Sequence, residues 1–540
     1  MLEGKDTLAL MPTGGGKSLC FQVPALALDG LCIVVSPLIA LMKDQVEHLN
    51  QKGVKALAIT SAYSYSQVDA MFDRCIYDSE VKFLYLSPER LSSEMAMARI
   101  PQMNVSLIAV DEAHCISEWG YDFRPAYLNI SELRSMQPNA PVVALTASAT
   151  PVVVEDIQEK LGFGEQNVFR KSFYRENLSY WVAWEEDKFG VAERIARKHG
   201  GSGIIYMRSR KGTERITREL GERGMSIAFY HAGLDTEQRS ERQLQWMRGD
   251  VQVIAATNAF GMGIDKPDVR FVIHMDIPDT LENYYQECGR AGRDGNRAFA
   301  VALLNKQNVE IFKEKLIQAF PTKEEIKHAY GVMCNSLQLA IGSAKEESFA
   351  LDITSICQHY SLEPRKFIQC LKFLEREGYI VFKETSDTLS SLQFKVDNEA
   401  LYQLKVSNEG MEPLIDGLLR SYSRLFEERS FISEWTLANR IRWPKDKVVN
   451  ALIWLDKSGY ITYQKASLLP TVLFLQERIS PKNLRISQEH YDVRKQVVEQ
   501  KAEAMLHYIE SNSKCRSRLI SEYFGEADTE DCGICDVCTG

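Results

Sequence analysis

A glycine-rich loop near the start of the chain contains residue types that bind phosphate. The segment MPTGGGKS (11–18) follows a short apolar stretch, DTLAL, and precedes a run that suits a helix. Consecutive glycines let backbone N–H groups converge on phosphate oxygens without obstruction by Cβ atoms. The Lys17 ammonium can reach the outer phosphates and the Ser18 hydroxyl can hold Mg²⁺. Although Met11 stands where the usual pattern has glycine, we predict a nucleotide-binding loop of Thr13, Gly14, Gly15, Gly16, Lys17 and Ser18.

An acidic pair further along the chain supplies the second part of such a site. Asp111 and Glu112, in DEAH (111–114), directly follow the apolar run LIAV. A carboxylate at the end of a buried strand can meet the Mg²⁺ that Ser18 holds, so Asp111 is the predicted metal contact. Glu112 is the predicted base that orients and deprotonates the attacking water. With the loop, this pair predicts hydrolysis of ATP with Mg²⁺.

The segment YYQECGRAGRDG (284–295) offers the positive charge that phosphoryl transfer requires. Arg290 and Arg293 are three residues apart, on one face of a helical turn, and Gln286 can reach the water or the γ-phosphate. The alternative is a solvated basic helix end, but the sequence GRAGR is costly for an ordinary helix. We predict that these side chains act catalytically from a second domain.

Short apolar runs predict the sheets that position these residues. The four runs before residue 150 are unbroken and made of residues that favour strands, as is typical of strands buried on both faces of a parallel sheet, and the later runs repeat the scheme. In an open α/β sheet, ligands gather at the carboxyl ends of such strands. The runs predict two α/β domains in series, at 1–172 and 173–320. They are LCIVVSP (31–37), FLYLSP (83–88), LIAVDEAH (107–114), PVVALTA (141–147), GIIYMRS (203–209), MSIAFYHAG (225–233), VQVIAAT (251–257) and VRFVIHMD (269–276).

An internal repeat follows these domains. Residues 353–382 resemble residues 433–463. Each copy has the pattern of a helix, a turn with proline near the next helix start, a second helix, a glycine and a strand. The pattern predicts two winged-helix-like units, at 321–400 and 401–485. Two helical hairpins with no role in DNA binding are the alternative.

Four of the twelve cysteines lie together at the end of the chain. Cys515, Cys532, Cys535 and Cys538 give the spacing C-x16-C-x2-C-x2-C. Four thiolates can close a tetrahedral Zn²⁺ site, and a closed site is structural rather than catalytic. We therefore predict a helical zinc-binding module at 486–540. One metal site with otherwise scattered thiols suits a reducing compartment.

The composition is that of a globular protein, with 45% hydrophobic and 25% charged residues. Because no apolar stretch approaches the roughly 18 residues of a membrane span, we expect a soluble, cytoplasmic chain without a membrane partner. The net charge of −9 argues weakly against a nucleic-acid partner. A local basic track can still grip phosphates on an acidic protein.

Together with TASAT (146–150) and ATNAFGMGIDKPDVRFVIH (256–274), these motifs resemble those of superfamily 2 helicases. CISEWGYDFRPAY (115–127) is similar to the aromatic-rich loop of RecQ helicases. SPLIALMKDQV (36–46), YLSPERL (85–91) and the terminal cysteines also agree with that family. The resemblance covers roughly 1–318 and 490–540.

Resemblance to RecQ implies two RecA-like lobes that use ATP and Mg²⁺ to move 3′→5′ on single-stranded DNA and unwind duplexes in repair and recombination. It implies single-stranded and forked duplex DNA as partners, and nothing requires more than a monomer. Asp265 and Arg270 are expected to face the nucleotide cleft or the strand, and Thr146, Ser148 and Thr150 are expected to link the lobes.

The aromatic-rich loop implies a sensor of single-stranded DNA. Trp119, Phe123 and Arg124 match the family pattern, and bases can stack on such groups without sequence readout. Buried core aromatics are the alternative. Tyr121 stands where the family usually has histidine, and it can still stack and form hydrogen bonds.

The order and extent of the chain's parts also depart from the family. In RecQ proteins the zinc module follows the second lobe almost at once, whereas here the repeated units lie between them. We hypothesise an insertion that grips or splits duplex DNA in place of the usual winged helix. The ten residues before Met11 leave no room for the family's N-terminal glutamine motif. Either the chain is a fragment, which we favour, or nucleotide selectivity is relaxed.

Two other classes of function remain open. A motor that moves on duplex DNA or remodels RNA–protein complexes would share the lobes, but the aromatic loop and zinc module argue against it. A DNA-binding regulator with a degenerate nucleotide fold would have lost Lys17, Glu112 or Arg290, and all three are present.

Overall fold

The computed structural model describes residues 1–12, 14–60, 63, 65–261, 264, 266–383, 390–422, 425–427, 430–465, 469–527 and 529–540. The chain divides into two units. The first unit joins Met1–Ile317 to Glu489–Gly540, and the second unit is Gln318–Gln488. Among the described helices, none has both the length and the apolar character that crossing a membrane requires.

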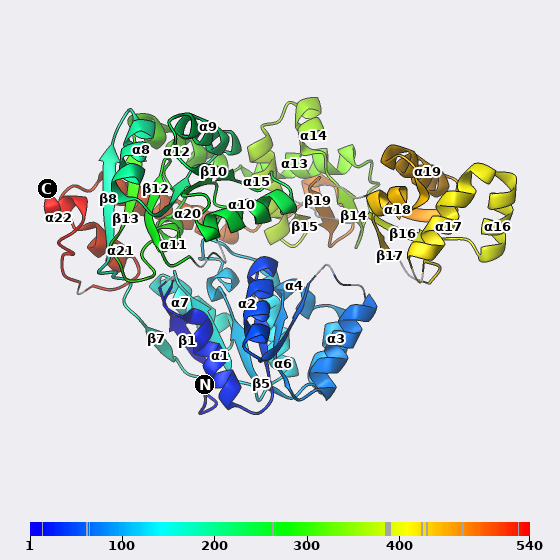
Figure 1. Ribbon diagram of the computed structural model, residues 1–540, viewed down its shortest axis with the longest axis horizontal. Helices are drawn as coiled ribbons and strands as arrows, with labels where there is room; N and C mark the ends of the chain where they lie inside the picture. The colour runs from blue at the N-terminus through cyan, green and yellow to red at the C-terminus, as the bar shows by residue number, and fades with distance from the viewer. Residues whose placement is uncertain are drawn as a thin grey trace. The chain divides into compact units, whose positions relative to one another are not determined.

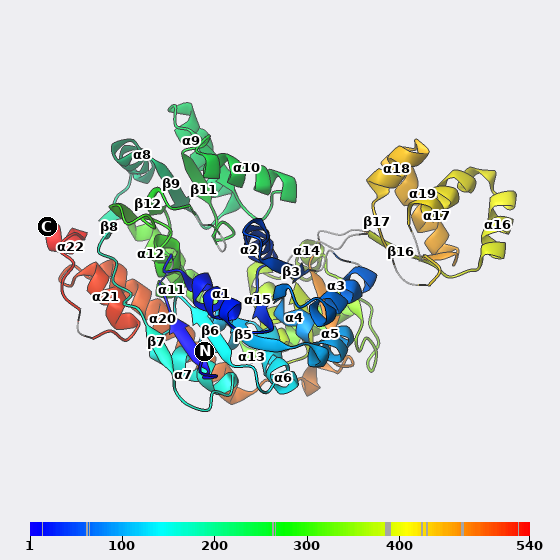
Figure 2. The same ribbon diagram turned by 60° about the horizontal axis from the view of Figure 1, so that its bottom comes forward.

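Lobe 1 of the first unit is a parallel sheet with helices on both faces, in the strand order β3-β4-β2-β5-β6-β1-β7 (Figures 1 and 2). Its strands are β1 (Thr7–Leu10), β2 (Leu31–Val35), β3 (Lys55–Ile59), β4 (Val81–Leu86), β5 (Val105–Val110), β6 (Val142–Thr146) and β7 (Val168–Arg170). Its helices are α1 (Lys17–Ala27), α2 (Ile39–Gln51), α3 (Tyr65–Tyr77), α4 (Pro88–Leu91), α5 (Glu94–Arg99), α6 (Ile130–Met136) and α7 (Pro151–Lys160), with short 3-10 turns η1 (Ile100–Gln102), η2 (Ala113–Ile116) and η3 (Pro125–Asn129).

The central strands of lobe 1, such as β2 and β6, are buried on both faces, as their unbroken apolar sequences predict. Ile33 and Val35 of β2 belong to the core on one face of the sheet. Cys32 and Val34, which alternate with them, belong to the core on the other face. Side chains along a strand point alternately to the two faces, so a strand covered on both sides must be apolar at every position.

Lobe 2 repeats this architecture in the strand order β10-β11-β9-β12-β13-β8, again parallel throughout. Its strands are β8 (Leu178–Trp184), β9 (Ser202–Tyr206), β10 (Ile227–Tyr230), β11 (Val253–Ala256), β12 (Val269–His274) and β13 (Ala298–Leu304). Its helices are α8 (Lys188–His199), α9 (Arg210–Glu222), α10 (Thr236–Arg248), α11 (Leu281–Cys288) and α12 (Lys306–Ala319).

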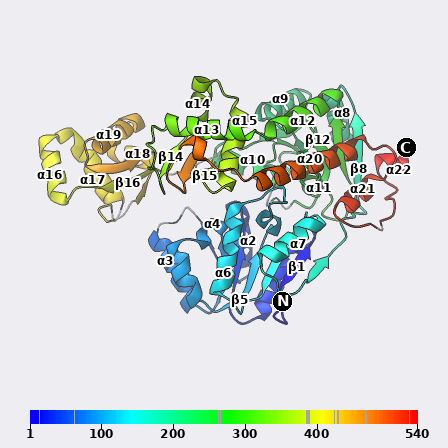
Figure 3. The same ribbon diagram turned by 180° about the vertical axis from the view of Figure 1, so that it is seen from behind.

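The C-terminal segment completes lobe 2. It contains α20 (Gln488–Glu510), α21 (Arg516–Tyr523) and α22 (Asp536–Thr539). Figure 3 shows α20 running across lobe 2 near α11, and Met505 and Tyr508 of α20 are buried in the lobe 2 core. The chain therefore returns to the first unit after the second unit is complete.

The second unit holds two antiparallel sheets, one with the order β14-β19-β15 and the other β17-β16-β18. Its strands are β14 (Ser348–Ala350), β15 (Ile380–Lys383), β16 (Ser390–Phe394), β17 (Ser430–Ile432), β18 (Ile461–Gln464) and β19 (Thr471–Phe474). Its helices are α13 (Lys323–Ser336), α14 (Ile353–Tyr360), α15 (Pro364–Arg376), α16 (Asn398–Ser407), α17 (Glu412–Ser421), α18 (Glu434–Ile441) and α19 (Lys445–Lys457), with 3-10 turns η4 (Glu409–Met411) and η5 (Pro481–Asn483).

Both copies of the repeat form the predicted helix, turn, helix and strand. The first helix of each copy ends in a left-handed residue, Ser361 after α14 and Arg442 after α18. Pro364 then begins α15, and Pro444 is the N-cap of α19. The second helix leads into β15 in one copy and β18 in the other. The sequence pattern therefore predicts the local structure of both copies.

The two winged-helix sheets are nested, whereas the predicted units at 321–400 and 401–485 are in tandem. β19 pairs with β14 and β15 of the first copy, and Lys383 lies opposite Thr471. The whole sheet of the second copy lies in sequence between β15 and β19. A break at residue 400 would therefore put β16 with the wrong sheet and β19 with the wrong copy. The repeat shows two helix pairs, but it cannot show which distant strand closes each sheet.

A pair of glycines in lobe 2 tests the packing of its sheet. A Cβ atom on Gly203 of β9 would lie 2.1 Å from the Phe271 ring, whereas a Cβ on Gly221 of α9 would meet no atom within 4 Å. Gly203→Ala should destabilise the fold by about 1–3 kcal/mol, because the buried ring has no room to move. Gly221→Ala should stabilise it by up to about 1 kcal/mol through helix propensity. Thermal unfolding of both variants checks this, and a shift of the same sign for both would contradict the packing described.

Candidate functional site

The glycine-rich loop has a backbone that requires its glycines. Gly14 and Gly16 have φ values of +79° and +82°. Residues other than glycine rarely adopt this backbone conformation. A Cβ atom on Gly15 would lie 2.8 Å from the Pro12 carbonyl oxygen. Gly16 is the N-cap of α1, so the free N–H groups of the first helical turn open onto the loop. Such a helix N-terminus favours an anion.

An ion pair joins this loop to the acidic motif. Lys17 Nζ lies 3.1 Å from Glu112 Oε1. Burial by itself would lower the pKa of Lys17, but the charges of Glu112 and Asp111 outweigh it and raise that pKa. Burial, and after it the charge of Glu112, raises the pKa of Asp111 to about 6. Burial would also raise the pKa of Glu112, but the Lys17 charge is the main influence that brings it below its ordinary value. The Lys17 charge therefore favours the ionised form of both carboxylates.

The backbone and side chain of Glu112 are both unusual. Its backbone is left-handed, with φ of 46°. Its buried Oε2 has no hydrogen-bond partner among the described residues and lies 3.4 Å from His114 Nδ1. A buried carboxylate oxygen without a donor can accept a proton from water, as the predicted base must.

Ser18 and Asp111 each have a neighbour that the sequence reasoning did not single out. Gln45 of α2 donates to the Ser18 hydroxyl at 3.2 Å, and Tyr85 donates to Gln45 Oε1 at 2.9 Å. Ser36 donates to Asp111 Oδ2 at 3.4 Å. Gln45 and Ser36 lie in SPLIALMKDQV (36–46), a segment noted for its family resemblance. A hydroxyl and a carboxylate oriented in this way form a donor set of hard oxygens that suits Mg²⁺.

A line of hydrogen bonds runs from the acidic motif to lobe 2. His114 Nδ1 lies 2.9 Å from Thr146 Oγ1, and that oxygen accepts from the Ser148 amide at 3.3 Å. Gln286 of α11 then donates to the Ser148 hydroxyl at 3.1 Å. TASAT therefore connects the acidic motif of lobe 1 to α11 of lobe 2, and Gln286 reaches lobe 1 through this motif. His114 was not singled out from the sequence as a site residue.

The two predicted arginines face the loop to different degrees. The Arg293 side chain lies against the glycine-rich loop. A Cβ atom on Gly14 would be 3.0 Å from Arg293 Cγ. Its Nη1 donates to the Ile264 carbonyl at 2.8 Å. Arg290 is buried and donates to the Gly261 carbonyl. Its Nε has no hydrogen-bond partner among the described residues, and its charge contributes to lowering the pKa of Glu112.

Arg270 is not brought to this site, and two other predicted residues, Thr13 and Asp265, lie outside the described residues. Arg270 pairs with Asp294 at 2.6 Å and donates to the backbone carbonyls of Asp268 and Arg297. Its guanidinium is therefore held by its own lobe.

The aromatic loop folds back over the acidic motif. Gly120 makes this possible, because a Cβ atom there would lie 2.5 Å from the His114 carbonyl oxygen. The Tyr121 ring stacks on His114, with ring centroids 4.6 Å apart. Burial and the charge of Glu112 raise the pKa of Tyr121 well above its ordinary value, which a hydrogen bond with Ser148 offsets only in part. Tyr121 therefore joins the line of contacts between the lobes.

The remaining loop residues divide into exposed and anchored groups. Trp119 is 37% exposed, and Phe123 is half-buried. Arg124 forms an ion pair with Asp122 at 2.9 Å and donates to the Pro37 carbonyl at 3.3 Å. Of the four predicted DNA-contacting residues, Trp119 presents the most accessible ring, whereas Tyr121 points toward its own domain.

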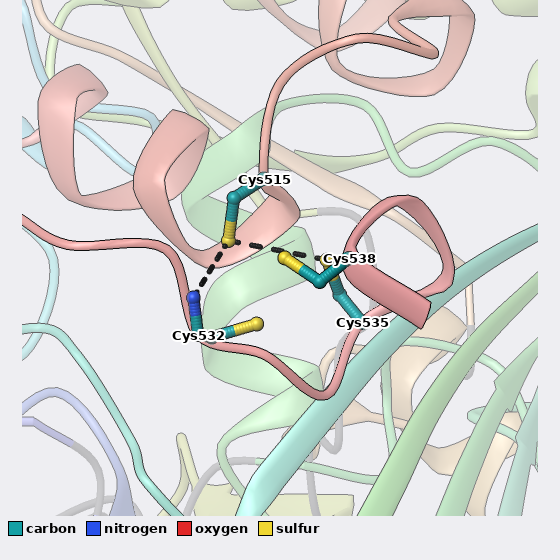
Figure 4. Close-up of side chains that lie close together, drawn as sticks. All are labelled: Cys515, Cys532, Cys535 and Cys538. Atoms are coloured by element: carbon teal, nitrogen blue, oxygen red, sulfur yellow. Dashed lines mark hydrogen bonds between the residues drawn. The ribbon is translucent and has the colours of Figure 1, made fainter. Parts of the chain in front are cut away.

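The cysteines at the end of the chain converge as their spacing predicts (Figure 4). The Sγ atoms of Cys515, Cys532, Cys535 and Cys538 all lie within 4.8 Å of one another. This fits tetrahedral Zn²⁺, whose Zn–S bonds are about 2.3 Å long. Burial would raise the pKa of Cys532, but hydrogen bonds, the first from the Ile534 amide, lower it to about 7. Bound Zn²⁺ would favour all four thiolates and would crosslink the segment.

The cysteine cluster is anchored to lobe 2 by the residues around it. Arg516 is buried and forms an ion pair with Asp536 at 3.0 Å. Asp536 also accepts from the Val182 amide of β8 at 3.1 Å, and Ser179 donates to the Ile534 carbonyl. The cysteine segment therefore lies against β8, the edge strand of the lobe 2 sheet.

Replacing one cysteine tests the zinc assignment. Cys515→Ser should reduce bound zinc from about one ion per chain to a small fraction of that, because three thiolates leave a structural site open. It should also lower the unfolding temperature of lobe 2. Cys20→Ser, a half-buried thiol outside the cluster, is the matched control and should keep its zinc. Atomic absorption on the purified proteins measures both, and a full zinc complement in Cys515→Ser would contradict the assignment.

Models of known families match most of this architecture. The DEAD/DEAH box helicase model matches residues 1–157, and the helicase conserved C-terminal domain model matches 187–295. The model of the RecQ helicase winged-helix domain of Bacteroidota matches 392–465, and the RecQ zinc-binding model matches 476–539. These ranges cover both lobes, the second winged-helix copy and the cysteine cluster.

Curated relatives agree with these models. The ATP-dependent DNA helicase RecQ of Pasteurella multocida (strain Pm70) is 45% identical over 304 residues, which are 56% of this chain and 48% of the relative. The "Probable ATP-dependent DNA helicase RecS" of Bacillus subtilis (strain 168) is 40% identical over 341 residues, 62% of this chain and 68% of the relative. The chain spans about half the length of the first of these. The chain belongs to the RecQ family of superfamily 2 helicases.

Proposed function

We propose that this chain is an ATP-driven DNA helicase that moves 3′→5′ along single-stranded DNA and separates duplex strands, in DNA repair and recombination. The observation that carries the proposal is the Lys17–Glu112 ion pair at the phosphate loop, with Arg293 of lobe 2 packed on Gly14. The relatives named above are DNA helicases by name, which supports DNA as the partner. A monomer in the cytoplasm is part of the same proposal.

The site residues have distinct roles in this proposal. The loop amides and Lys17 bind the outer phosphates of ATP, so Lys17 leaves Glu112 as the nucleotide enters. Ser18 and Asp111 would hold Mg²⁺, which neutralises the phosphate charge. Glu112 then accepts a proton from the attacking water through its unpaired oxygen. Arg290 and Arg293 stabilise the charge that develops on the γ-phosphate.

The aromatic loop couples DNA to this chemistry in the same proposal. Trp119 is exposed enough to receive a base, and stacking on it needs no particular base. Tyr121, four residues before Pro125, stacks on His114, and His114 contacts Thr146. A base that displaces the loop would therefore disturb the contact between Ser148 and Gln286. DNA binding and lobe closure are linked through these side chains.

Lys17→Ala and Trp119→Ala test the motor and its sensor in one experiment. Steady-state ATP hydrolysis is measured with and without a single-stranded oligonucleotide. Lys17→Ala should lower hydrolysis by on the order of 10²-fold or more under both conditions, because the phosphates lose their fixed cation. Trp119→Ala should lose mainly the stimulation by DNA, because one stacking platform is removed.

Two matched controls accompany these variants. Lys160→Ala removes an exposed lysine from the end of α7, and Trp184→Ala removes a tryptophan that is 45% exposed on β8. Both should behave as the parent chain. If RNA stimulates hydrolysis as strongly as single-stranded DNA, the assignment to DNA fails.

The second unit is proposed to grip or split duplex DNA as an insertion in the family's usual order. Removal of residues 325–485 should lower unwinding of a forked duplex severalfold while leaving hydrolysis stimulated by single-stranded DNA. The reason is that both lobes and the cysteine cluster lie in the first unit. A fluorescence assay of strand separation measures the effect, and normal unwinding after the deletion would refute this role.

A further inference from the structure

The second unit contains a pocket that is rich in positive charge. Its volume is about 740 Å³, and its lining includes Lys323 and Lys327 of α13 together with Lys482, Asn483 and Arg485. The first pair comes from the start of α13 and the others from η5 and the segment after it. Residues more than 150 positions apart in sequence therefore converge on one hollow.

The wall formed by residues 481–487 is fixed in place. Tyr379 donates to the Arg485 carbonyl at 3.1 Å and accepts from the Arg485 amide at 3.0 Å. Leu484 is buried. On the opposite side, Pro481 lies so close to α13 that a Cβ on Gly331 would be 3.0 Å from its Cγ. The pocket is therefore held open by packing and by backbone hydrogen bonds.

Three of the four cations in this pocket have no carboxylate partner among the described residues. No acidic side chain lines it among the described residues. Lys327, Lys482 and Arg485 form no ion pair with a described carboxylate. The neighbouring Glu325 is already paired with Lys366, and Glu377 accepts the Ser487 amide at 3.3 Å. Three cations without a described counterion, Lys327, Lys482 and Arg485, indicate a site for an external anion on this chain of net charge −9.

Lys323 differs from the other three cations. It donates to the Ile486 carbonyl at 3.2 Å and to the Gln488 side chain. It therefore ties α13 to the far wall while adding its charge to the pocket. Lys482 and Arg485 are exposed at the rim, where a ligand can reach them.

We propose that this pocket binds backbone phosphates of duplex DNA. The inference rests on the proposed function, which it deepens by naming the residues that hold the duplex. Lysine and arginine contacts to phosphate supply affinity without reading sequence. The lining offers charge and backbone rather than aromatic rings, so it fits a duplex backbone better than unstacked bases.

The test is the combined variant Lys327→Ala, Lys482→Ala and Arg485→Ala in the full chain. Its affinity for a fluorescent forked duplex is measured by anisotropy over a series of salt concentrations. Binding should weaken by on the order of tenfold, and the slope of log affinity against log salt should fall by about two to three, since each lost phosphate contact removes about 0.9. Lys323 is kept, because removing it would also release α13 from the far wall.

A variant with the same change of charge is the control. Arg194→Ala, Lys198→Ala and Arg218→Ala removes exposed cations from α8 and α9. It should keep the parent's affinity and salt slope. An equal loss in this control, or an unchanged slope in the pocket variant, would overturn the proposal. So would a pocket variant that loses only binding of free pyrophosphate, since the pocket would then serve a free anion.

Hydrolysis stimulated by single-stranded DNA separates this inference from the proposed function. If the parent chain is stimulated and the pocket variant binds the duplex as the parent does, the pocket inference fails alone. If the parent shows no stimulation, the proposed function fails. The pocket variant should keep the stimulation of the parent, because its changes lie outside the unit that holds both lobes.

Discussion

The Lys17–Glu112 ion pair is the interaction on which the candidate site depends. Two adjacent carboxylates at the end of a buried strand are unfavourable unless a cation lies within reach. The strand order β5-β6-β1 puts the carboxyl ends of β5 and β1 on either side of β6. DEAH follows β5, TASAT begins within β6, and the phosphate loop follows β1. The sheet topology therefore brings lysine and carboxylates together.

The second consequence of this arrangement is that β6 lies between the two halves of the site. Thr146 and Ser148 at its end contact His114 on one side and Gln286 of lobe 2 on the other. Tyr121 stacks on His114 from the aromatic loop. His114 therefore lies beside both Glu112 of the acidic motif and Tyr121 of the aromatic loop.

Much of this arrangement could be predicted from the sequence, because it rests on local rules. Unbroken apolar runs predict strands such as β2, which is buried at every residue. The short spacings of Cys532, Cys535 and Cys538 predict a metal cluster, and the Sγ atoms converge. The three glycines of the phosphate loop are required by φ values and by contact with Pro12.

The features that could not be predicted depend on contacts between distant segments. In the nested sheets of the second unit, β19 pairs with β14 and β15, which lie far before it in sequence. No local sequence pattern predicts which strands pair in this way. Gln45 reaches Ser18 from another helix, and a lone glutamine gives no signal of this. The sequence does not show that the Tyr121 ring stacks on His114, because this contact depends on the close approach of Gly120 to the His114 carbonyl.

The most direct test of the account is the direction of unwinding. Two duplexes of the same sequence, one with a 3′ single-stranded tail and one with a 5′ tail, are incubated with the chain, ATP and Mg²⁺, and strand separation is followed by fluorescence. The account predicts that the 3′-tailed duplex is unwound and that the 5′-tailed duplex stays paired. Unwinding of the 5′-tailed duplex alone, or of neither while DNA still stimulates hydrolysis, would contradict it.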